Sequence, residues 1–446
     1  MINLFIRFII FFCFTGLLYS EEDFEIPRYE ELEAIESLQS QAKVESMSLA
    51  ELEEYATNNN PLYLAAKKDL GIARSGVLSA AIRHNPILYF EQQFIQSKAG
   101  YSAPLIGSLG GDAGGGVESA PKISYEFDLS GIRNQNIKLA RQEYKTALSN
   151  FSNFDRLFRL RLRQNYWYYL YITNLVDTQE EVYNNYIDLL KLSRFRVSKG
   201  DISQLEYDRL ELEKVRIERN YRNVNILKAR IARNLRVLVG IDPEGRTLKF
   251  KDKLIFRRTE ELGLDLENYN IQNRPDYQAM LSETHRKRLE VELEEKKGGA
   301  LPYLSVGAEL RFKTGETFAG IFAQTPLKVF DRNQGGILKS KEKHRKSLLK
   351  LQSKKNEIIA EIVAAKRELL AREEILREYE SMNLVEKNKQ VQEKYRLAYN
   401  RGASNLVTFL EAERNYLSVQ NGYNEQMYLY YNAIETYRAA IGKLGK

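Results

Sequence analysis

Residues that commonly hold metals or attack substrates are scarce in this sequence of 446 residues, which has one cysteine and three histidines. Cys13 lies in an apolar run near the N-terminus, and His84, His285 and His344 are far apart along the chain. We therefore expect no disulfide, no cysteine nucleophile and no metal site built from these side chains. Carboxylates are plentiful, but they follow helical patterns without a cleft signature. Neither catalysis nor a cofactor is therefore expected.

Long apolar runs are also missing beyond the N-terminus. Residues 1–20 hold one positive charge, Arg7, and a short apolar run, and an acidic stretch begins at Glu21. This pattern predicts a secretory signal peptide cleaved after Ser20, because a permanent anchor needs about 20 apolar residues. No later stretch is long enough for a spanning helix. If the mature chain enters a membrane, it must do so as β-strands.

A dense basic block is absent, although the net charge is +7. Acidic and basic residues alternate along almost the whole chain, which is typical of solvated helix faces. Binding to nucleic acid would need a concentrated basic surface, so we expect no nucleic-acid partner. The acidic segment 21–47 has no core-facing period and is expected to be a periplasmic extension.

The rest of the chain divides into two similar parts, residues 48–240 and 271–446, joined by a connecting segment at 241–270. Each part is predicted to contain an opening helix, two strands, a long helix and a shorter returning helix. The opening helices are expected at 58–85 and 273–297, the strands at about 87–96, 121–129, 302–313 and 318–330, the long helices at about 132–197 and 337–398, and the returning helices at 204–240 and 405–441.

Alternation of apolar and polar residues supports the strands. In the third strand, Leu304, Val306 and Ala308 alternate with polar residues or glycine, as in a strand that is wet on one face only. Each strand is near the length of about 9 to 11 residues that crosses a bilayer when tilted. The Gly-rich segment 101–120 between the first two strands is predicted to be a mobile loop.

Apolar residues recur every seven positions in the long helices, for example at Tyr144, Phe151 and Phe158. This spacing indicates helices packed side by side as in a coiled coil. The opening and returning helices of each half together match the length of its long helix. Two short helices stacked end to end are therefore expected alongside each long one.

Four strands are too few to close a membrane barrel, since bacterial barrels start at about eight strands and open edges are not tolerated in lipid. We therefore expect several copies to combine, and three copies would supply twelve strands. The long helices would continue the barrel as a water-filled duct. A soluble periplasmic coiled-coil scaffold capped by β-hairpins remains the alternative.

This arrangement resembles the TolC-like outer membrane factor family over roughly residues 48–442. The shared features are the signal peptide, the repeated order of elements, an Asn-Pro or Arg-Pro opening in each half and Gly-containing turns between helices. The segment TPLKVFDRNQGGI, residues 325–337, is further similar to the heavy-metal branch of CzcC-like proteins. The motif residues are Phe330, Asp331, Arg332, Asn333, Gln334 and Gly335.

Residues of this motif suit a strand-to-helix corner. Asp331 and Asn333 are expected to cap the free N–H groups of the following helix, and Gly335 and Gly336 to permit close approach or unusual backbone angles. We favour this structural role over a role in transport.

The resemblance implies a mainly α, TolC-like fold, with four strands per protomer in a 12-stranded trimeric β-barrel in the outer membrane. It implies a passive exit duct of a tripartite efflux system, working with a periplasmic membrane fusion adaptor and an inner-membrane pump, with the RND type favoured. Heavy-metal cations are favoured as cargo over drugs. A type I secretion exit duct is the alternative within the family.

The resemblance also implies that the two helical turns meet at the periplasmic tip, where an adaptor docks. The residues that fit this role are Arg196, Gly200 and Ser203 in the first turn and Arg396, Gly402 and Ser404 in the second. Four acidic residues near the turns are candidates for an entrance that attracts cations: Asp201, Glu206, Asp208 and Glu393. Ordinary solvation of exposed helices is the alternative for these charges. The aromatic clusters at 166–171 and 428–431 are expected to pack helices together.

Overall fold

The computed structural model describes residues 46–94, 117–241, 249–267, 269–313 and 316–444. The predicted signal peptide, almost all of the acidic extension and most of the predicted loop at 101–120 lie outside the described residues.

Both halves of the described chain follow the same order of elements. The first contains α3 (Leu49–Asn59), α4 (Pro61–Ala81), β1 (Ile87–Phe94), β2 (Val117–Asp128), α5 (Ile132–Lys199) and α6 (Gln204–Val239). The second contains η1 (Ile271–Asn273), α7 (Pro275–Lys297), β3 (Tyr303–Lys313), β4 (Glu316–Gln324), α8 (Gln334–Ser381), α9 (Leu384–Asn400) and α10 (Leu406–Ala440). The predicted fold class, mainly α with a small antiparallel sheet, is confirmed.

The second long helix departs from the single helix expected at 337–398. It is divided into α8 and α9 after Ser381, and Asn383 between them has a left-handed backbone with φ of 48°. Asparagine tolerates this conformation better than most residues. The series of apolar residues at Ile362, Leu369 and Leu376 reaches Asn383 at its next position, so the heptad pattern stops where the helix is interrupted.

Proline and asparagine set other boundaries. Asn60 is extended and its side chain caps α4. The opening helix expected at 58–85 is therefore α4, which ends at Ala81, and it is preceded by a separate helix, α3, that the sequence did not predict. The fourth strand ends at Gln324 and does not reach 330, because Pro326 has no N–H to offer to the sheet. The second strand begins earlier than expected, at Val117, and accommodates Pro121.

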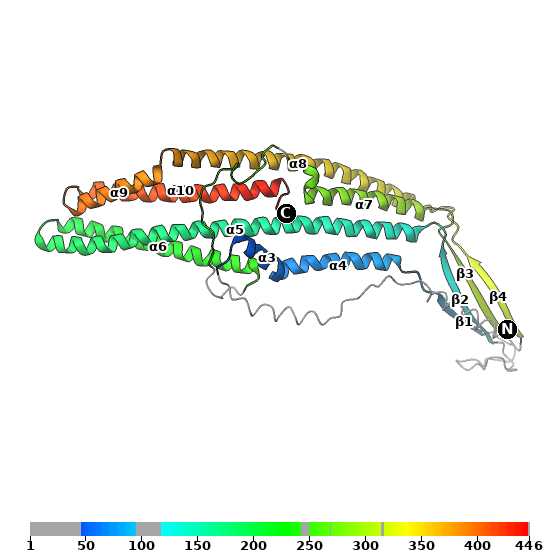
Figure 1. The fold of residues 1–446 in the computed structure, drawn as a ribbon. Helices are drawn as coiled ribbons and strands as arrows, with labels where there is room; N and C mark the ends of the chain where they lie inside the picture. Colours follow the sequence, from blue (N-terminus) through cyan, green and yellow to red (C-terminus); the bar gives the residue numbers. More distant parts are fainter. Residues whose placement is uncertain (1–45, 95–116, 242–248, 268, 314–315, 445–446) are drawn as a thin grey trace. The chain divides into compact units, whose positions relative to one another are not determined.

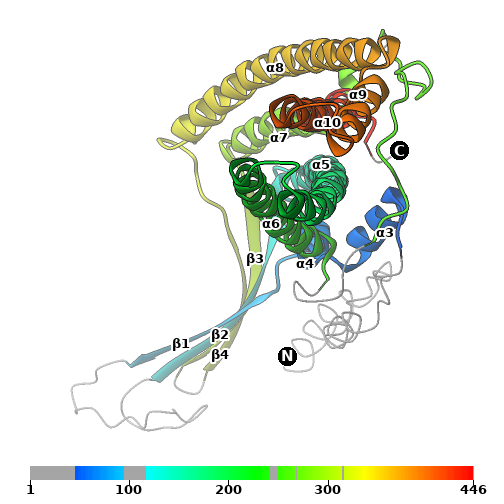
Figure 2. The same cartoon turned by 90° about the vertical axis from the view of Figure 1, so that its left-hand side faces the viewer.

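The helices form a layer whose order repeats the strand order of the sheet. The sheet runs β1-β2-β3-β4 with antiparallel neighbours. Along the layer, α4 and α6 pack on α5, α5 packs on α7 and α10, and these pack on α8, with α9 on α10 (Figure 1). Since α4 leads into β1 and β4 leads into α8, the helix layer and the sheet have the same two edges. Figure 2 views this layer from the end of the helical turns.

The sheet has one apolar and one polar face. Leu88, Ile123, Ala308 and Ile321 lie in one row across the four strands. In the next row, on the other face, Lys122 bonds to Glu91 at 2.8 Å and lies 3.6 Å from Glu309. Leu88 is 73% and Ile321 is 89% exposed, so both ends of this apolar row are uncovered by the described parts of the chain.

The long helix α5 supplies much of the core. Its 68 residues extend about 100 Å at 1.5 Å per residue. Phe158, Leu162 and Tyr166 are buried along its inward stripe, and Trp167 stacks on Tyr431 of α10 with 4.2 Å between ring centroids. These contacts show that the aromatic clusters at 166–171 and 428–431 pack helices together, as predicted.

Tyrosine hydroxyls hold residues 249–265, here called the strap, against the helix layer. Tyr430 donates to the carbonyl of Arg257 at 2.8 Å and Tyr431 to that of Ile255 at 2.6 Å. Tyr437 donates to the carbonyl of Asp265 at 2.8 Å. On α8, the buried carboxylate of Glu373 accepts from Thr259 Oγ1 at 2.8 Å. These bonds fix a segment that has little regular structure of its own.

Candidate functional site: the paired helical turns

In the turn between α5 and α6, one residue ends α5 and another caps the start of α6. Gly200 has φ of 80° and lets the N–H of Asp201 reach the carbonyl of Arg196 at 2.9 Å, which closes the last helical turn. Three residues later, Ser203 Oγ accepts from the N–H of Glu206 at 3.2 Å and caps α6. The chain reverses direction within a few residues.

The turn between α9 and α10 has the same design, with asparagine in place of serine as the helix cap. Gly402 has φ of 75°, and the N–H of Ala403 reaches the carbonyl of Ala398 at 2.8 Å. Asn405, three residues after this glycine, caps α10 through the N–H of Thr408 at 2.9 Å. Asn405 is therefore the counterpart of Ser203, and the expected Ser404 lies one residue before the cap.

The two turns lie at the same end of the helix layer (Figure 1) and are joined by one arginine. Arg196 of the first turn donates to the carbonyl of Tyr399 in α9 at 3.0 Å, and its guanidinium lies 5.6 Å from the Tyr399 ring centroid. Arg396 is six residues before Gly402, whereas Arg196 is four before Gly200. Its charge acts on Glu413 of α10, so the two arginines have different surroundings.

The candidate entrance charges are accompanied by cations. Asp201, Asp208 and Glu393 are exposed, and Glu206 is half-buried in the first turn of α6. Exposed Lys199, Arg209, Lys394 and Arg401 lie on the same segments. Within a Debye length, opposite charges in such mixed surroundings largely cancel.

A hydrophobic cluster packs the helices next to the turns. It includes Tyr186 and Leu210 from the first half and Tyr399, Leu406 and Phe409 from the second. Tyr399 stacks on Phe409 with 5.2 Å between centroids. The sequence pattern did not single out these residues. Their meeting depends on how α5 and α10 lie against each other.

The motif corner at 330–336 joins α7 to α8. Asn333, at the start of α8, has φ of 60° and makes no capping bond with its side chain. Its amide instead donates to the carbonyl and carboxylate of Glu294 at 2.9 and 2.7 Å. The expected capping role of Asn333 is therefore wrong, because the side chain is used to bind α7.

Other motif residues bond within the corner. Asp331 accepts from the N–H of Asn333 at 2.8 Å, and Gln334 accepts from the N–H of Arg332 at 3.0 Å. Close approach occurs at Gly336, where an added Cβ would lie 2.2 Å from Asn333 Oδ1, whereas one at Gly335 would meet nothing within 4 Å. Phe330 is 92% exposed. The bonds of Asp331 and Asn333 hold the start of α8 at this corner.

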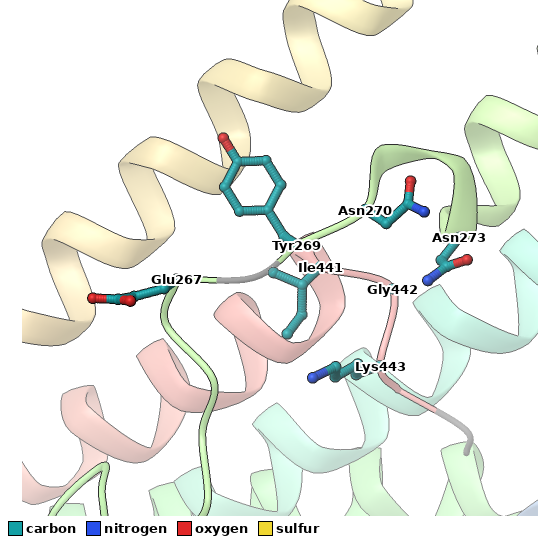
Figure 3. A pocket seen from close by; sticks show the side chains of 7 residues that line it. All are labelled: Glu267, Tyr269, Asn270, Asn273, Ile441, Gly442 and Lys443. Atoms are coloured by element: carbon teal, nitrogen blue, oxygen red, sulfur yellow. The ribbon is translucent and has the colours of Figure 1, made fainter.

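A pocket lies near the end of α10, away from the two helical turns. The pocket in Figure 3 has a volume of about 370 Å³ and lies between residues 267–273 and residues 441–443, which follow α10. The side chains of Glu267, Tyr269 and Lys443 line it without converging on one point. In the described parts of the chain, no group of three or more His, Cys, Asp or Glu side chains is placed to hold a metal ion. None of the described helices is long and apolar enough to cross a membrane.

Comparison with known proteins gives structural matches without sequence matches. No protein-family model matches the chain, and no curated protein matches it in sequence. The structure is similar to the Campylobacter jejuni CmeC outer membrane channel, with a TM-score of 0.72 and 16% identity over 95% of this chain and 93% of that one. It is also similar to CusC, a protein described with transmembrane channel formation, with a TM-score of 0.71 and 14% identity over 95% of this chain and 98% of that one.

A third similar structure is the outer membrane protein VceC from Vibrio cholerae, with a TM-score of 0.69 and 15% identity over 88% of this chain and 96% of that one. At such identities the likeness establishes the fold. The chain has the TolC-like fold shared by these outer-membrane proteins, as the sequence predicted.

Proposed function

We propose that three copies of this chain form a passive exit duct, with the sheets in the outer membrane and the helices in the periplasm. The observation that carries the proposal is the pair of unlike edges, β1 with α4 on one side and β4 with α8 on the other. Identical copies joined edge to unlike edge form a closed ring when the rotation closes. Such a ring would leave no open strand edge.

The two faces of the sheet support a place in lipid. The apolar row through Leu88 and Ile321 suits hydrocarbon, while Lys122 and its carboxylate partners suit a wet lumen. Three copies of the four-stranded sheet would supply a twelve-stranded barrel. An alternation of this kind is what membrane barrels require.

The outer helices carry apolar seams that lack a partner within the described chain. On α6, Leu205, Leu212 and Ile226 keep heptad spacing and are exposed. On α8, Leu349, Val363 and Leu370 do the same. These seams suit coiled-coil packing between neighbouring copies.

A periplasmic adaptor docking on the turns would complete the export system, with an inner-membrane pump of RND type supplying the energy. The turns are the exposed end of the helix layer farthest from the sheet, which makes them the accessible end of a duct. The docking residues proposed are Arg196, Gly200, Ser203, Arg396, Gly402 and Ser404. Heavy-metal cations are the favoured cargo, on the likeness of residues 325–337 alone. Tight metal sites are not needed, because tight binding would stall exit.

Cell fractionation and the mass of the detergent-extracted particle test the duct. A trimer in the outer-membrane fraction is expected, and a detergent-free soluble monomer would contradict the proposal and favour the periplasmic scaffold. Deleting the gene and comparing growth with zinc, copper, silver and common drugs tests the cargo. Sensitivity to drugs but not to metals would remove the heavy-metal assignment. Loss of a secreted protein, with unchanged growth, would favour type I secretion.

Gly200→Val tests docking at the turns. The substitution forces a β-branched residue to φ of 80°, where an added Cβ would meet nothing within 4 Å, so the strain comes from the backbone angle of the turn. Export is expected to fall while trimers persist. Gly263→Val is the matched control, since Gly263 also has positive φ and open space but lies in the strap. Equal export by both variants would argue against docking at this turn.

A further inference from the structure

Helix α9 is attached to the rest of the chain by few buried side chains. Of its 17 residues, Gln392 and Tyr399 are buried, and it packs on α10 (Figure 1). It follows the left-handed Asn383, where the long helix is interrupted. A segment with a hinge and little buried surface needs little energy to move.

Gln392 binds a carboxyl group that is itself buried. Its amide donates to Oε1 of Glu413 on α10, and Glu413 is 2% exposed. The other oxygen, Oε2, has no hydrogen-bond partner among the described residues. A charged carboxylate in such a place is costly, whereas a neutral carboxylic acid is much less so.

The groups around Glu413 come from each element packed there. Glu181 and Tyr186 approach from α5, Arg396 from α9 and Tyr416 from α10 itself. Burial raises the pKa of Glu413, and the charge of Glu181 raises it further. The Gln392 amide and the Arg396 charge lower this pKa only in part.

Other charges in this region act on the neighbouring tyrosines. Glu213, Arg216 and Arg414 act on Tyr186, and Glu393 acts on Tyr416. Glu213 is already paired, with Arg414 at 3.5 Å. No described cation forms an ion pair with Glu413.

We propose that Glu413 is a positioning residue: its protonated carboxyl holds α9 against α10, and its ionisation releases α9, so that the position of the second turn depends on pH. In the packed arrangement the neutral acid fits the dry seam. Ionisation requires water at Oε2, which enters only when α9 moves away from α10. In a duct of the proposed function, this movement would widen or narrow the end where the turns lie.

The direction of the pH effect follows from the two environments. Separated from α9, a hydrated carboxyl has its ordinary pKa of about 4.5, while the packed carboxyl has a raised pKa. Below pH 4.5 both arrangements are protonated and packing is fully favoured. Between the two pKa values, each pH unit favours the separated arrangement by up to about tenfold. Above the raised pKa the preference stops changing.

Spin labels on the full-length protein measure this movement directly. Labels on cysteines introduced at Lys394 of α9 and Asn415 of α10, both exposed, report the distance between the helices in detergent, because the one native cysteine, Cys13, lies in the predicted signal peptide. The packed fraction is expected to fall as the pH rises from 4.5, and Glu413→Gln is expected to remain packed at every pH. Gln392→Leu removes the donor to Oε1 and should lower the packed fraction while keeping its pH slope.

Glu373→Gln is the matched control, because Glu373 is also 2% exposed but its oxygens bond to Thr259 and Arg377. It should keep the wild-type pH profile. A wild-type distance that is independent of pH, or a wild-type profile in Glu413→Gln, would overturn the proposal. The pH-dependent contact between α9 and α10 does not rest on the proposed function. Only its effect on the end of a duct does. The label distance is measured without an export assay, so a failure of the pH-dependent contact and a failure of the exit duct are separate results.

Discussion

At the scale of single residues, two adjacent glycines of the motif corner have unlike surroundings. Gly336→Ala would place Cβ 2.2 Å from Asn333 Oδ1 and 2.7 Å from Glu294 Oε2. The joint between α7 and α8 would have to shift, and we expect a loss of about 1–3 kcal/mol in unfolding free energy. Gly335→Ala has open space and should be neutral or stabilise by about 0.5–1 kcal/mol. Thermal unfolding in detergent measures both, and similar losses would show that the corner is not the cause.

Arg196 is the residue that joins the two turns. Arg196→Gln removes the bond to the Tyr399 carbonyl and the charge beside its ring, at an expected cost of about 1 kcal/mol. Since the bond links the halves of the chain locally, we expect faster limited proteolysis at 198–203 and 400–405 with little change in the global unfolding temperature. Arg194→Gln, an exposed position on the same helix, serves as the control. Equal cleavage of the two variants would refute the linking role.

At the scale of elements, buried charges join the start of α7 to the end of α10. Arg274 is 1% exposed, binds Asp276 at 2.9 and 2.6 Å and donates to the carbonyl of Ala440 at 3.0 Å. Arg156 of α5 donates to the carbonyl of Ala439 at 3.0 Å. Both guanidinium groups thus satisfy the end of α10, where the helix dipole favours positive charge.

Asp276→Asn tests this joint. It leaves buried arginines short of negative charge and should cost about 3–5 kcal/mol in unfolding free energy, measured with urea near neutral pH. Burial raises the pKa of Asp276, but Arg274 more than offsets this and holds that pKa below its ordinary 3.8. The stabilisation is therefore present above pH 3.8 and lost as the pH falls through the lowered pKa. Glu361→Gln, at a partner of Arg274 that is 42% exposed, should cost much less. An equal loss in both would exclude the buried pair as the cause.

The strap depends on side chains from distant helices. Tyr430→Phe removes one hydroxyl bond to Arg257 and should cost about 1 kcal/mol. The loss should appear as faster hydrogen exchange in residues 255–259. Tyr428→Phe is the control, since that ring stacks on Tyr171 with 5.4 Å between centroids, away from these bonds. Unchanged exchange in Tyr430→Phe would mean that Thr259 and Glu373 are enough to hold the strap.

At the scale of the whole molecule, the proposed ring predicts that exposed apolar residues on α6 and α8 affect the assembly of copies and not the fold of one chain. Leu212→Glu changes a side chain that is 72% exposed on α6. It should leave the fold of one chain intact while reducing the trimer fraction by at least about tenfold, if the seam carries more than about 1.4 kcal/mol. Native mass spectrometry in detergent measures this fraction. Ile255→Glu, at a 54% exposed strap position, should leave it unchanged. Trimers that survive Leu212→Glu would place the seam elsewhere.

Local pattern was enough to predict the four strands, the first long helix and the two helical turns, but it predicted neither α3 nor the division of the second long helix into α8 and α9. Alternation in residues 303–313 gave a strand, seven-residue spacing around Phe151 gave a coiled-coil helix, and glycine at 200 and 402 gave the turns. Each of these signals comes from neighbours in the sequence, whose periodicity fixes which face is apolar.

The binding of Asn333 to Glu294, the link from Arg196 to Tyr399 and the burial of Glu413 were decided by the tertiary structure. In each of these three cases the partner lies on another helix. A side chain's hydrogen bonds and burial depend on which helices lie beside it, and the period of one helix does not contain that information. The sequence by itself therefore determined most of the elements and their apolar faces, and the packing of the helix layer decided which polar residues meet.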